Sequence, residues 1–220
     1  IKQEFRLLGE LRPDSPKMCS EFWSGWFDKW GGAHETRGAK EMVDGLEEMI
    51  QNNISFSLYM THGGSNWGHW AGANSPGFAP DVTSYDYDAP INEYGHATPK
   101  YYELRNMMAK YSDKPLIDVP EPPMPIITVP EINFTHFAPL FSSLPEPVAI
   151  DKIKTMEEFD QGWGSILYRT TVDEHNGQSL LQVFEPHDYA QIFVNGNLIG
   201  AMDRRVRENT VVLPSLKQGD

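Results

Sequence analysis

The sequence is poor in cysteine, in positive charge and in long hydrophobic runs, and each shortage excludes something. A single cysteine, Cys19, rules out a disulfide within the chain. Lysine and arginine number 18 against 31 acidic residues, and the net charge of -13 argues against nucleic acid or an anionic membrane as partner. No apolar run approaches the length of a membrane span, and no signal-peptide pattern opens the sequence.

The residues that are abundant indicate a loop-rich globular protein. The 220 residues are 40% hydrophobic, which is enough for one sizeable core or two modest ones. Aromatic residues make up 12%, with 17 prolines and 18 glycines. An acidic protein of this kind suits an uncharged substrate.

Residues 1–112 alternate helical and strand patterns. The expected elements are a helix ending at Leu11, strands at 17–22 and 56–60, a helix at 39–50, and a helix starting at Thr98-Pro99 with Tyr101, Leu104, Met108 and Tyr111 on its apolar face. The order helix–strand–helix–strand–helix predicts α/β architecture with parallel strands.

Two further regions follow. Residues 113–150 carry nine prolines and are predicted to form an extended linker that could add an edge strand at 126–129 or 132–137. From about 151 the pattern becomes β, with alternation at 166–172 and a hairpin turn at Asn195-Gly196.

The strongest indication of catalytic chemistry is in residues 19–31, CSEFWSGWFDKWG. Glu21 closes a short extended run and is followed at once by five aromatic residues. A carboxylate can attack or stabilise a cationic anomeric carbon, and aromatic rings lie against the apolar face of a sugar. Without further context, such a glutamate is a structural ion-pair partner about as often as a nucleophile.

A second informative stretch follows the strand at 56–60. It contains HGGSN at 62–66 and TSYDYDAP at 83–90. In a parallel α/β barrel, the loops after the strands build the active site. Glu21 and Tyr59, both at the carboxyl ends of strands, are therefore expected to lie at the same face of the barrel. His34 and His62 lack a third ligand nearby in the sequence, and the sequence predicts neither a metal nor a cofactor.

These three segments together resemble the family 35 β-galactosidases. Residues 155–162 and 167–171 also resemble the start of that family's galactose-binding-like β domain. The resemblance implies the C-terminal part of a (β/α)8 catalytic barrel at 1–112, the linker at 113–150 and the start of a β-sandwich domain at 151–220, incomplete at both ends.

The resemblance also implies roles for individual residues. Glu21 corresponds to the catalytic nucleophile of a retaining glycosidase, and Tyr59 and Tyr87 correspond to galactose-contacting tyrosines. Trp26 and Tyr85 map to aromatic positions of the same pocket. Asn66 is placed in the substrate site only by its position in the loop.

The family's general acid/base glutamate, in an Asn-Glu pair, has no match here. Asp86, Asp88 and Glu93 are the nearby acidic candidates, and we give them little weight, because Asp86 and Asp88 alternate with Tyr85 and Tyr87 in a pattern suited to loop hydrogen bonding. We therefore expect an internal piece of a longer enzyme, inactive alone, which needs the remainder of the same polypeptide to complete the barrel.

Two functional hypotheses follow. The first is a β-galactosidase that acts on β-galactosides in oligosaccharides or glycans, in an extracytoplasmic compartment as the resemblance implies. The second is a non-catalytic carbohydrate-binding or structural piece whose barrel half serves only as a scaffold. Activity against a chromogenic β-galactoside discriminates between them.

Overall fold

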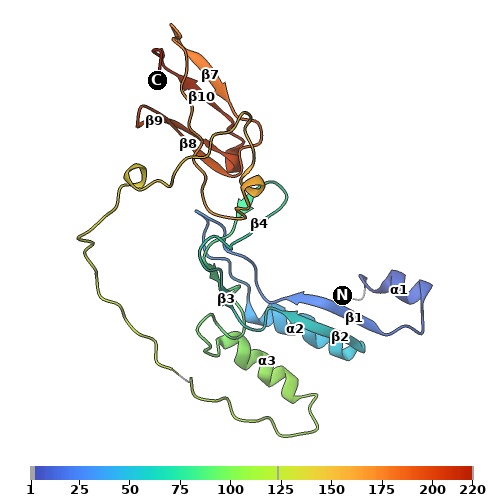
Figure 1. The fold of residues 1–220 in the computed structure, drawn as a ribbon. Helices are drawn as coiled ribbons and strands as arrows, with labels where there is room; N and C mark the ends of the chain where they lie inside the picture. The colour runs from blue at the N-terminus through green and yellow to red at the C-terminus, as the bar shows by residue number, and fades with distance from the viewer. Residues whose placement is uncertain (1–2, 123, 220) are drawn as a thin grey trace. The chain divides into compact units, whose positions relative to one another are not determined.

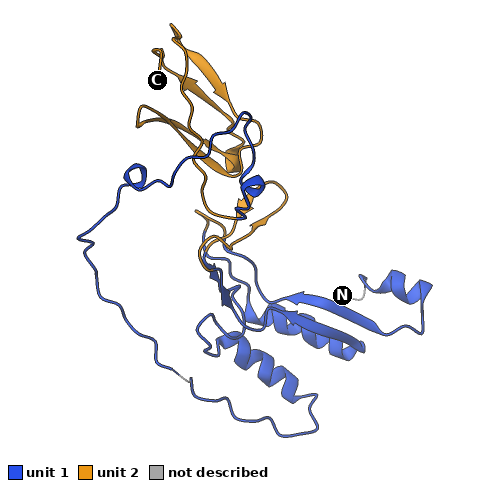
Figure 2. Cartoon of the chain, viewed as in Figure 1, with its two compact units in different colours: residues 1–28, 33–66, 83–162 blue, residues 29–32, 67–82, 163–220 orange. Residues whose placement is uncertain are grey.

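The structure is a computed structural model that describes residues 3–122 and 124–219. The chain forms two compact units (Figure 2). Unit 1 comprises residues 1–28, 33–66 and 83–162, and unit 2 comprises residues 29–32, 67–82 and 163–220. The domain limits at 112 and 150 stay a prediction.

Unit 1 is built on a strand–helix–strand arrangement. Strands β1 (Lys17–Trp23) and β2 (Ile54–Tyr59) pair in parallel, and helix α2 (Ala39–Gln51) connects them and covers one face of the pair (Figure 1). Asn53 has a φ of 54°, a left-handed conformation that asparagine tolerates at a helix end, and the chain turns there into β2. The expected order of elements and the parallel pairing are confirmed.

The core of unit 1 lies between α2, α3 (Pro99–Ala109) and the two strands. Its buried members are Met42, Val43, Leu46 and Met107, with Phe22 among the partly buried side chains against them. The period near 3.6 residues places the apolar side chains of α2 on one face, and burying a side chain such as Leu46 contributes roughly 1.5–3 kcal/mol.

The expected apolar face of α3 is wrong in part. Met108 and Tyr111 are exposed, whereas Met107 is 1% exposed and Lys100 is buried. The inward face of α3 therefore includes a lysine. A helix face predicted from apolar residues alone leaves this lysine out.

Shorter elements complete unit 1. They are α1 (Arg6–Leu11), the antiparallel pair β3 (Gly64–Ser65) and β6 (Ser84–Tyr85), and the 3-10 turns η1 (Leu140–Ser142) and η2 (Met156–Phe159). Residues 113–122 and 124–150 contain no strand, and their side chains are mostly exposed. Prolines there remove backbone donors that a ladder would need.

Unit 2 is built mainly from antiparallel pairs. These are β4 (Ala73–Asn74) with β5 (Ala79–Pro80), β7 (Ser179–Gln182) with β10 (Thr210–Leu213), and β8 (Tyr189–Val194) with β9 (Asn197–Asp203), followed by the 3-10 turn η3 (Arg204–Val206). The predicted hairpin at Asn195-Gly196 is confirmed, with both residues at positive φ. Met202 and Val211 are buried in this unit.

The strand predicted at 166–172 is wrong. The Val172 carbonyl accepts a hydrogen bond from the Gly219 backbone N–H at 2.9 Å, but no ladder continues along the segment. Alternating side chains form a strand only where a neighbouring strand takes up the backbone groups. Across the described parts of the chain, no helix is both long and apolar enough to cross a bilayer.

Candidate active site

Glu21 lies at an irregularity in strand β1. Cys19 pairs with Phe56 and Phe22 pairs with Leu58, so Ser20 and Glu21 together oppose the single residue Ser57. A bulge of this kind re-aims a side chain and is over-represented next to active sites. The strand continues to Trp23, one residue beyond the predicted end. The bulge leaves the Glu21 side chain exposed.

The carboxylate of Glu21 is held by its neighbour Trp23. The indole Nε1–H of Trp23 donates a hydrogen bond of 2.8 Å to Glu21 Oε2. The ring of Trp23 packs edge-on against Trp26, with their centroids 4.9 Å apart. Trp23 therefore links the carboxylate to the aromatic residues that follow, a role the sequence pattern did not reveal.

Four of the predicted site residues join in one aromatic cluster. Tyr87 lies at its centre, with ring centroids 5.5 Å from Tyr59, 5.7 Å from Tyr85 and 6.2 Å from Trp26. Phe27 stacks on Tyr85 at 4.8 Å. The phenol oxygens of Tyr59 and Tyr85 hydrogen-bond to each other. Segments at the ends of β1, β2 and β6 thus meet at one place in unit 1.

The phenol of Tyr87 is kept in its protonated form. Burial, then the nearby Tyr59, then the negative charge of Glu21 raise its pKa to about 12, against a smaller opposing effect of Arg37. The side chain is 3% exposed. Because the phenol stays neutral at physiological pH, it can donate a hydrogen bond beside the Glu21 carboxylate.

Asn66 lies at the base of the loop and not in the ring cluster. Its backbone N–H donates to the Thr83 carbonyl at 2.7 Å, which closes the base of the excursion 67–82. The neighbouring β3–β6 pair places Gly64 opposite Tyr85. The structure therefore places Asn66 next to Thr83, at the start of the segment 83–88 that carries Tyr85 and Tyr87.

The three candidate second carboxylates are all engaged within unit 1. Asp88 Oδ2 accepts from Lys100 Nζ at 2.5 Å, and Glu93 Oε2 accepts from Ser84 Oγ at 2.9 Å. Asp86 Oδ1 accepts from the Glu93 backbone N–H at 3.4 Å. The contacts of Asp86 and Asp88 fit the loop-stabilising role that their alternation with tyrosines predicted.

The two histidines of the site region also have local partners. His34 Nδ1 is 2.8 Å from Asp28 Oδ2, and the ring of His62 contacts the Gly63 carbonyl. Hydrogen bonding to Asp28, opposed by partial burial, raises the pKa of His34. Within residues 3–122 and 124–219, no three His, Cys, Asp or Glu side chains gather in a way that would hold a metal ion.

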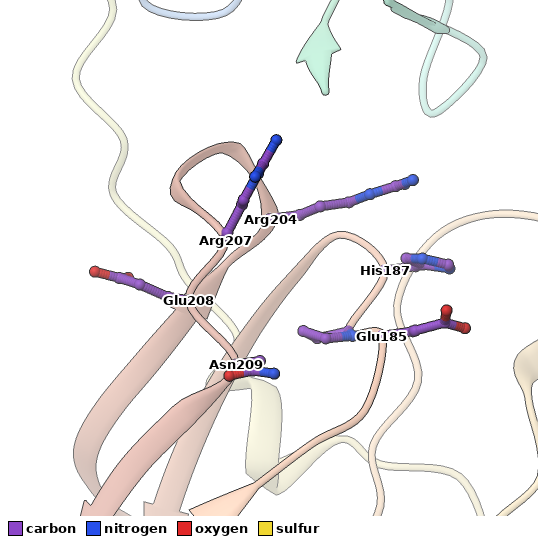
Figure 3. A pocket seen from close by; sticks show the side chains of 7 residues that line it. Glu185, His187, Arg204, Arg207, Glu208 and Asn209 are labelled. Carbon is purple, nitrogen blue, oxygen red and sulfur yellow. The ribbon is translucent and has the colours of Figure 1, made fainter. Parts of the chain in front are cut away.

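Unit 2 contains a separate shallow hollow of about 350 Å³ (Figure 3). Its lining consists of Glu185, Pro186, His187, Arg204, Arg207, Glu208 and Asn209. Figure 3 shows Glu208 directed away from His187 and Glu185, so the charged groups do not converge. The lining includes no Phe, Tyr or Trp ring on which a sugar could stack, so nothing in it indicates a sugar site.

Known protein families match both parts of the chain. The sequence model of the family described as glycosyl hydrolases family 35 matches residues 1–111, and that of the first all-beta domain of beta-galactosidase matches residues 154–220. A catalytic domain of the first kind and an all-β domain are therefore indicated.

Individual relatives match over nearly the whole chain. A beta-galactosidase of Xanthomonas manihotis is 37% identical over 94% of this chain and 35% of its own length. Beta-galactosidase-1-like protein 3 of Rattus norvegicus is 36% identical over 92% of this chain and 33% of its own length. A beta-galactosidase of Macaca fascicularis is 34% identical over 93% and 31%, respectively. The chain thus spans about a third of the length of these relatives.

Proposed function

Because this chain belongs to glycosyl hydrolase family 35, we propose that the full-length protein is a retaining β-galactosidase with Glu21 as its nucleophile. It removes terminal non-reducing β-D-galactose from oligosaccharides or glycans. The observation that carries this proposal is the Glu21 carboxylate, which stands at a strand bulge beside a cluster of aromatic rings. The names of the relatives support the choice of β-galactosides as substrates.

The proposed architecture follows from the family. In this proposal the parallel pair β1–β2 with its helix is the last part of a (β/α)8 barrel, with Glu21 near the end of strand seven and Tyr59 at the end of strand eight. Active sites of such barrels lie at the carboxyl ends of the strands, where both residues are found. Residues 151–220 begin a β-sandwich domain.

The chemistry has two displacements. An oxygen of the Glu21 carboxylate attacks the anomeric carbon of galactose, and the bond from that carbon to the glycosidic oxygen breaks. A carboxylic acid donates its proton to the leaving oxygen. In the second displacement, a water molecule attacks the same carbon and gives a proton to the deprotonated acid/base group. The bond between that carbon and Glu21 breaks, which releases β-galactose and restores both carboxyl groups. The Trp23 indole orients the attacking carboxylate.

The proposed binding roles use the ring cluster. Tyr59, Tyr85 and Tyr87 present phenol groups to the sugar hydroxyls, and Trp26 presents a ring to the apolar face of the sugar. Asn66 contributes a hydrogen bond from the base of its loop. No cofactor or metal is required, because both displacements use carboxyl groups.

The acid/base carboxyl group comes, in this proposal, from the remainder of the polypeptide. Asp86, Asp88 and Glu93 are engaged in contacts that stabilise the loop. A retaining site needs a second carboxyl group about 5–5.5 Å from the nucleophile and free to exchange a proton. The family's place for that group has no counterpart in the sequence.

The decisive experiment replaces Glu21 by glutamine in the full-length protein. We expect turnover of 4-nitrophenyl β-galactoside to fall by about 10³-fold or more, since an amide cannot form the glycosyl-enzyme. The matched control is Glu103→Gln on the exposed side of α3, which should keep the wild-type rate. Near-normal activity of E21Q would exclude Glu21 as the nucleophile.

The non-catalytic alternative predicts a different result. A carbohydrate-binding or structural protein would release no nitrophenol at all, even in its full-length wild-type form. An extracytoplasmic location remains part of the proposal and rests on family membership alone.

A further inference from the structure

Lys100 is a buried lysine whose ammonium group is fully used. It lies in the first turn of α3, and its side chain is 6% exposed. Nζ donates to the Ser24 carbonyl at 2.8 Å, to the Asp88 carbonyl at 2.7 Å and to Asp88 Oδ2 at 2.5 Å. An ammonium group has three donors, and each has an oxygen acceptor.

The acceptors belong to the two segments that carry the proposed site. Ser24 directly follows β1 and lies three residues after Glu21. Its backbone N–H donates to the Tyr59 carbonyl at 3.0 Å, and its Oγ donates to the Met60 carbonyl at 2.7 Å. Asp88 directly follows Tyr87. Lys100 therefore ties the ends of β1 and β2 to the segment of the central tyrosine.

That segment has a backbone which needs support. Tyr87 and Asp88 have φ values of 59° and 48°, in the left-handed region that non-glycine residues rarely adopt. Such residues persist only where surrounding contacts over-determine them. Lys100 binds both the carbonyl and the carboxylate of Asp88, and the backbone N–H of Arg37 donates to Asp88 Oδ2 at 2.7 Å.

The close approach of the two segments is visible at Gly25. A Cβ at this position would lie 1.8 Å from the Tyr87 carbonyl oxygen, so only glycine fits there. The chain after Glu21 and the chain at Tyr87 are thus in direct contact. A charged group placed beside this contact fixes the distance between them.

We propose that Lys100 is a positioning residue of the active site, which acts through Asp88 and Ser24 to hold Tyr87 and its ring cluster against the strand that carries Glu21. This inference rests on the proposed function. Lys100 touches no substrate in this role. Its ammonium group keeps the Tyr87 phenol and the Glu21 carboxylate in a fixed position relative to each other.

The test compares three variants of the full-length protein with 4-nitrophenyl β-galactoside. Lys100→Met keeps the length of the side chain and removes its charge and donors, whereas Lys100→Arg keeps a buried cation with several donors. Lys110→Met makes the same change just after the end of α3, where the lysine pairs with Glu47 at the surface. We expect kcat/KM to fall at least about tenfold in K100M, to recover partly in K100R and to stay within about twofold in K110M.

A double-mutant cycle separates positioning from general stability. If Lys100 acts through Tyr87, the losses from Lys100→Met and Tyr87→Phe are not additive, whereas those from Lys110→Met and Tyr87→Phe are. All rates are measured well below the unfolding temperature of the weakest variant. Additive losses from K100M and Y87F would overturn the inference, as would a K100M enzyme as active as K110M.

If K100M does not fold, a second substitution tests the same contact. Asp88→Asn retains the shape and an acceptor oxygen but removes the negative charge that Lys100 binds, and it should show the same non-additivity with Tyr87→Phe. Additivity there would overturn the inference. A wild-type protein that cleaves no β-galactoside overturns the proposed function together with this inference, whereas an active wild type with an unaffected K100M overturns this inference alone.

Discussion

The orientation of Glu21 depends on single neighbours as well as on its strand. The extra residue at the bulge leaves its carboxylate exposed, and Trp23 donates to one of its oxygens. Charge-assisted hydrogen bonds are stronger than neutral ones and fix direction. If Glu21 is the nucleophile that we propose, a carboxylate held in this way spends less time in unproductive rotamers.

Trp23→Phe tests this bond. The variant keeps a ring next to Trp26 but lacks the N–H that bonds to Glu21, and we expect kcat/KM for an aryl β-galactoside to fall about tenfold. Trp23 is 44% exposed, so water replaces part of the lost hydrogen bond and the loss stays moderate.

Trp30→Phe is the matched control, because Trp30 is an exposed ring of unit 2. It should leave the rate of the full-length protein unchanged. Equal rates for W23F and wild type would show that the indole does not orient the nucleophile.

At the scale of elements, the connection between β1 and α2 is organised by Asp28. Its two carboxylate oxygens accept from the Glu35 backbone N–H at 2.7 Å and contact His34 Nδ1 at 2.8 Å. His34 Nε2 is 3.8 Å from Asp86 Oδ2, in the segment of the tyrosines. This loop is therefore held by a histidine, the side chain whose charge is most often changed by pH in the physiological range.

We expect the contribution of His34 to stability to depend on pH. Its pKa is raised in the folded protein, so the folded state binds the proton more tightly than the unfolded chain does. The stabilisation is complete below the ordinary histidine pKa of about 6.5 and is lost as the pH rises through the folded value. Thermal unfolding should show a larger difference between wild type and His34→Gln at pH 5.5 than at pH 8.5.

His69→Gln serves as the comparison for that measurement, since His69 is an exposed histidine outside the Asp28 cluster. It shows how much of the H34Q effect comes from losing any exposed histidine, because His69 makes no contact with Asp28 among the described hydrogen bonds. A pH-independent effect of H34Q would mean that the Asp28–His34 pair contributes nothing as an ion pair.

Elements with strong local signals were predictable from the sequence. The apolar period of α2 and the Asn195-Gly196 turn each appear where predicted. Local signals failed where the outcome depends on a partner: residues 166–172 alternate but form no strand, and Met107 replaces Met108 in the core. Periodicity describes one element, whereas burial depends on what packs against it.

At the scale of the whole molecule, family membership is confirmed and activity is the proposal. We expect the 220-residue chain alone to release no nitrophenol from an aryl β-galactoside, because its three loop carboxylates are engaged and a retaining mechanism needs two carboxyl groups. The full-length protein should be active under the same conditions. Circular dichroism of the isolated chain checks that it is folded, and turnover by that folded chain would place the acid/base group within these residues.

The sequence by itself determined the family, the parallel strand–helix–strand unit and the candidate carboxylate with its aromatic residues. These follow from local patterns and from motifs in a fixed order. Only the tertiary structure decided the bulge at Glu21 and the burial of Lys100, because the first depends on strand register and the second on atoms contributed by segments that are distant in the sequence. A buried lysine is stable only where oxygen acceptors surround it, and no pattern within a single helix contains that information.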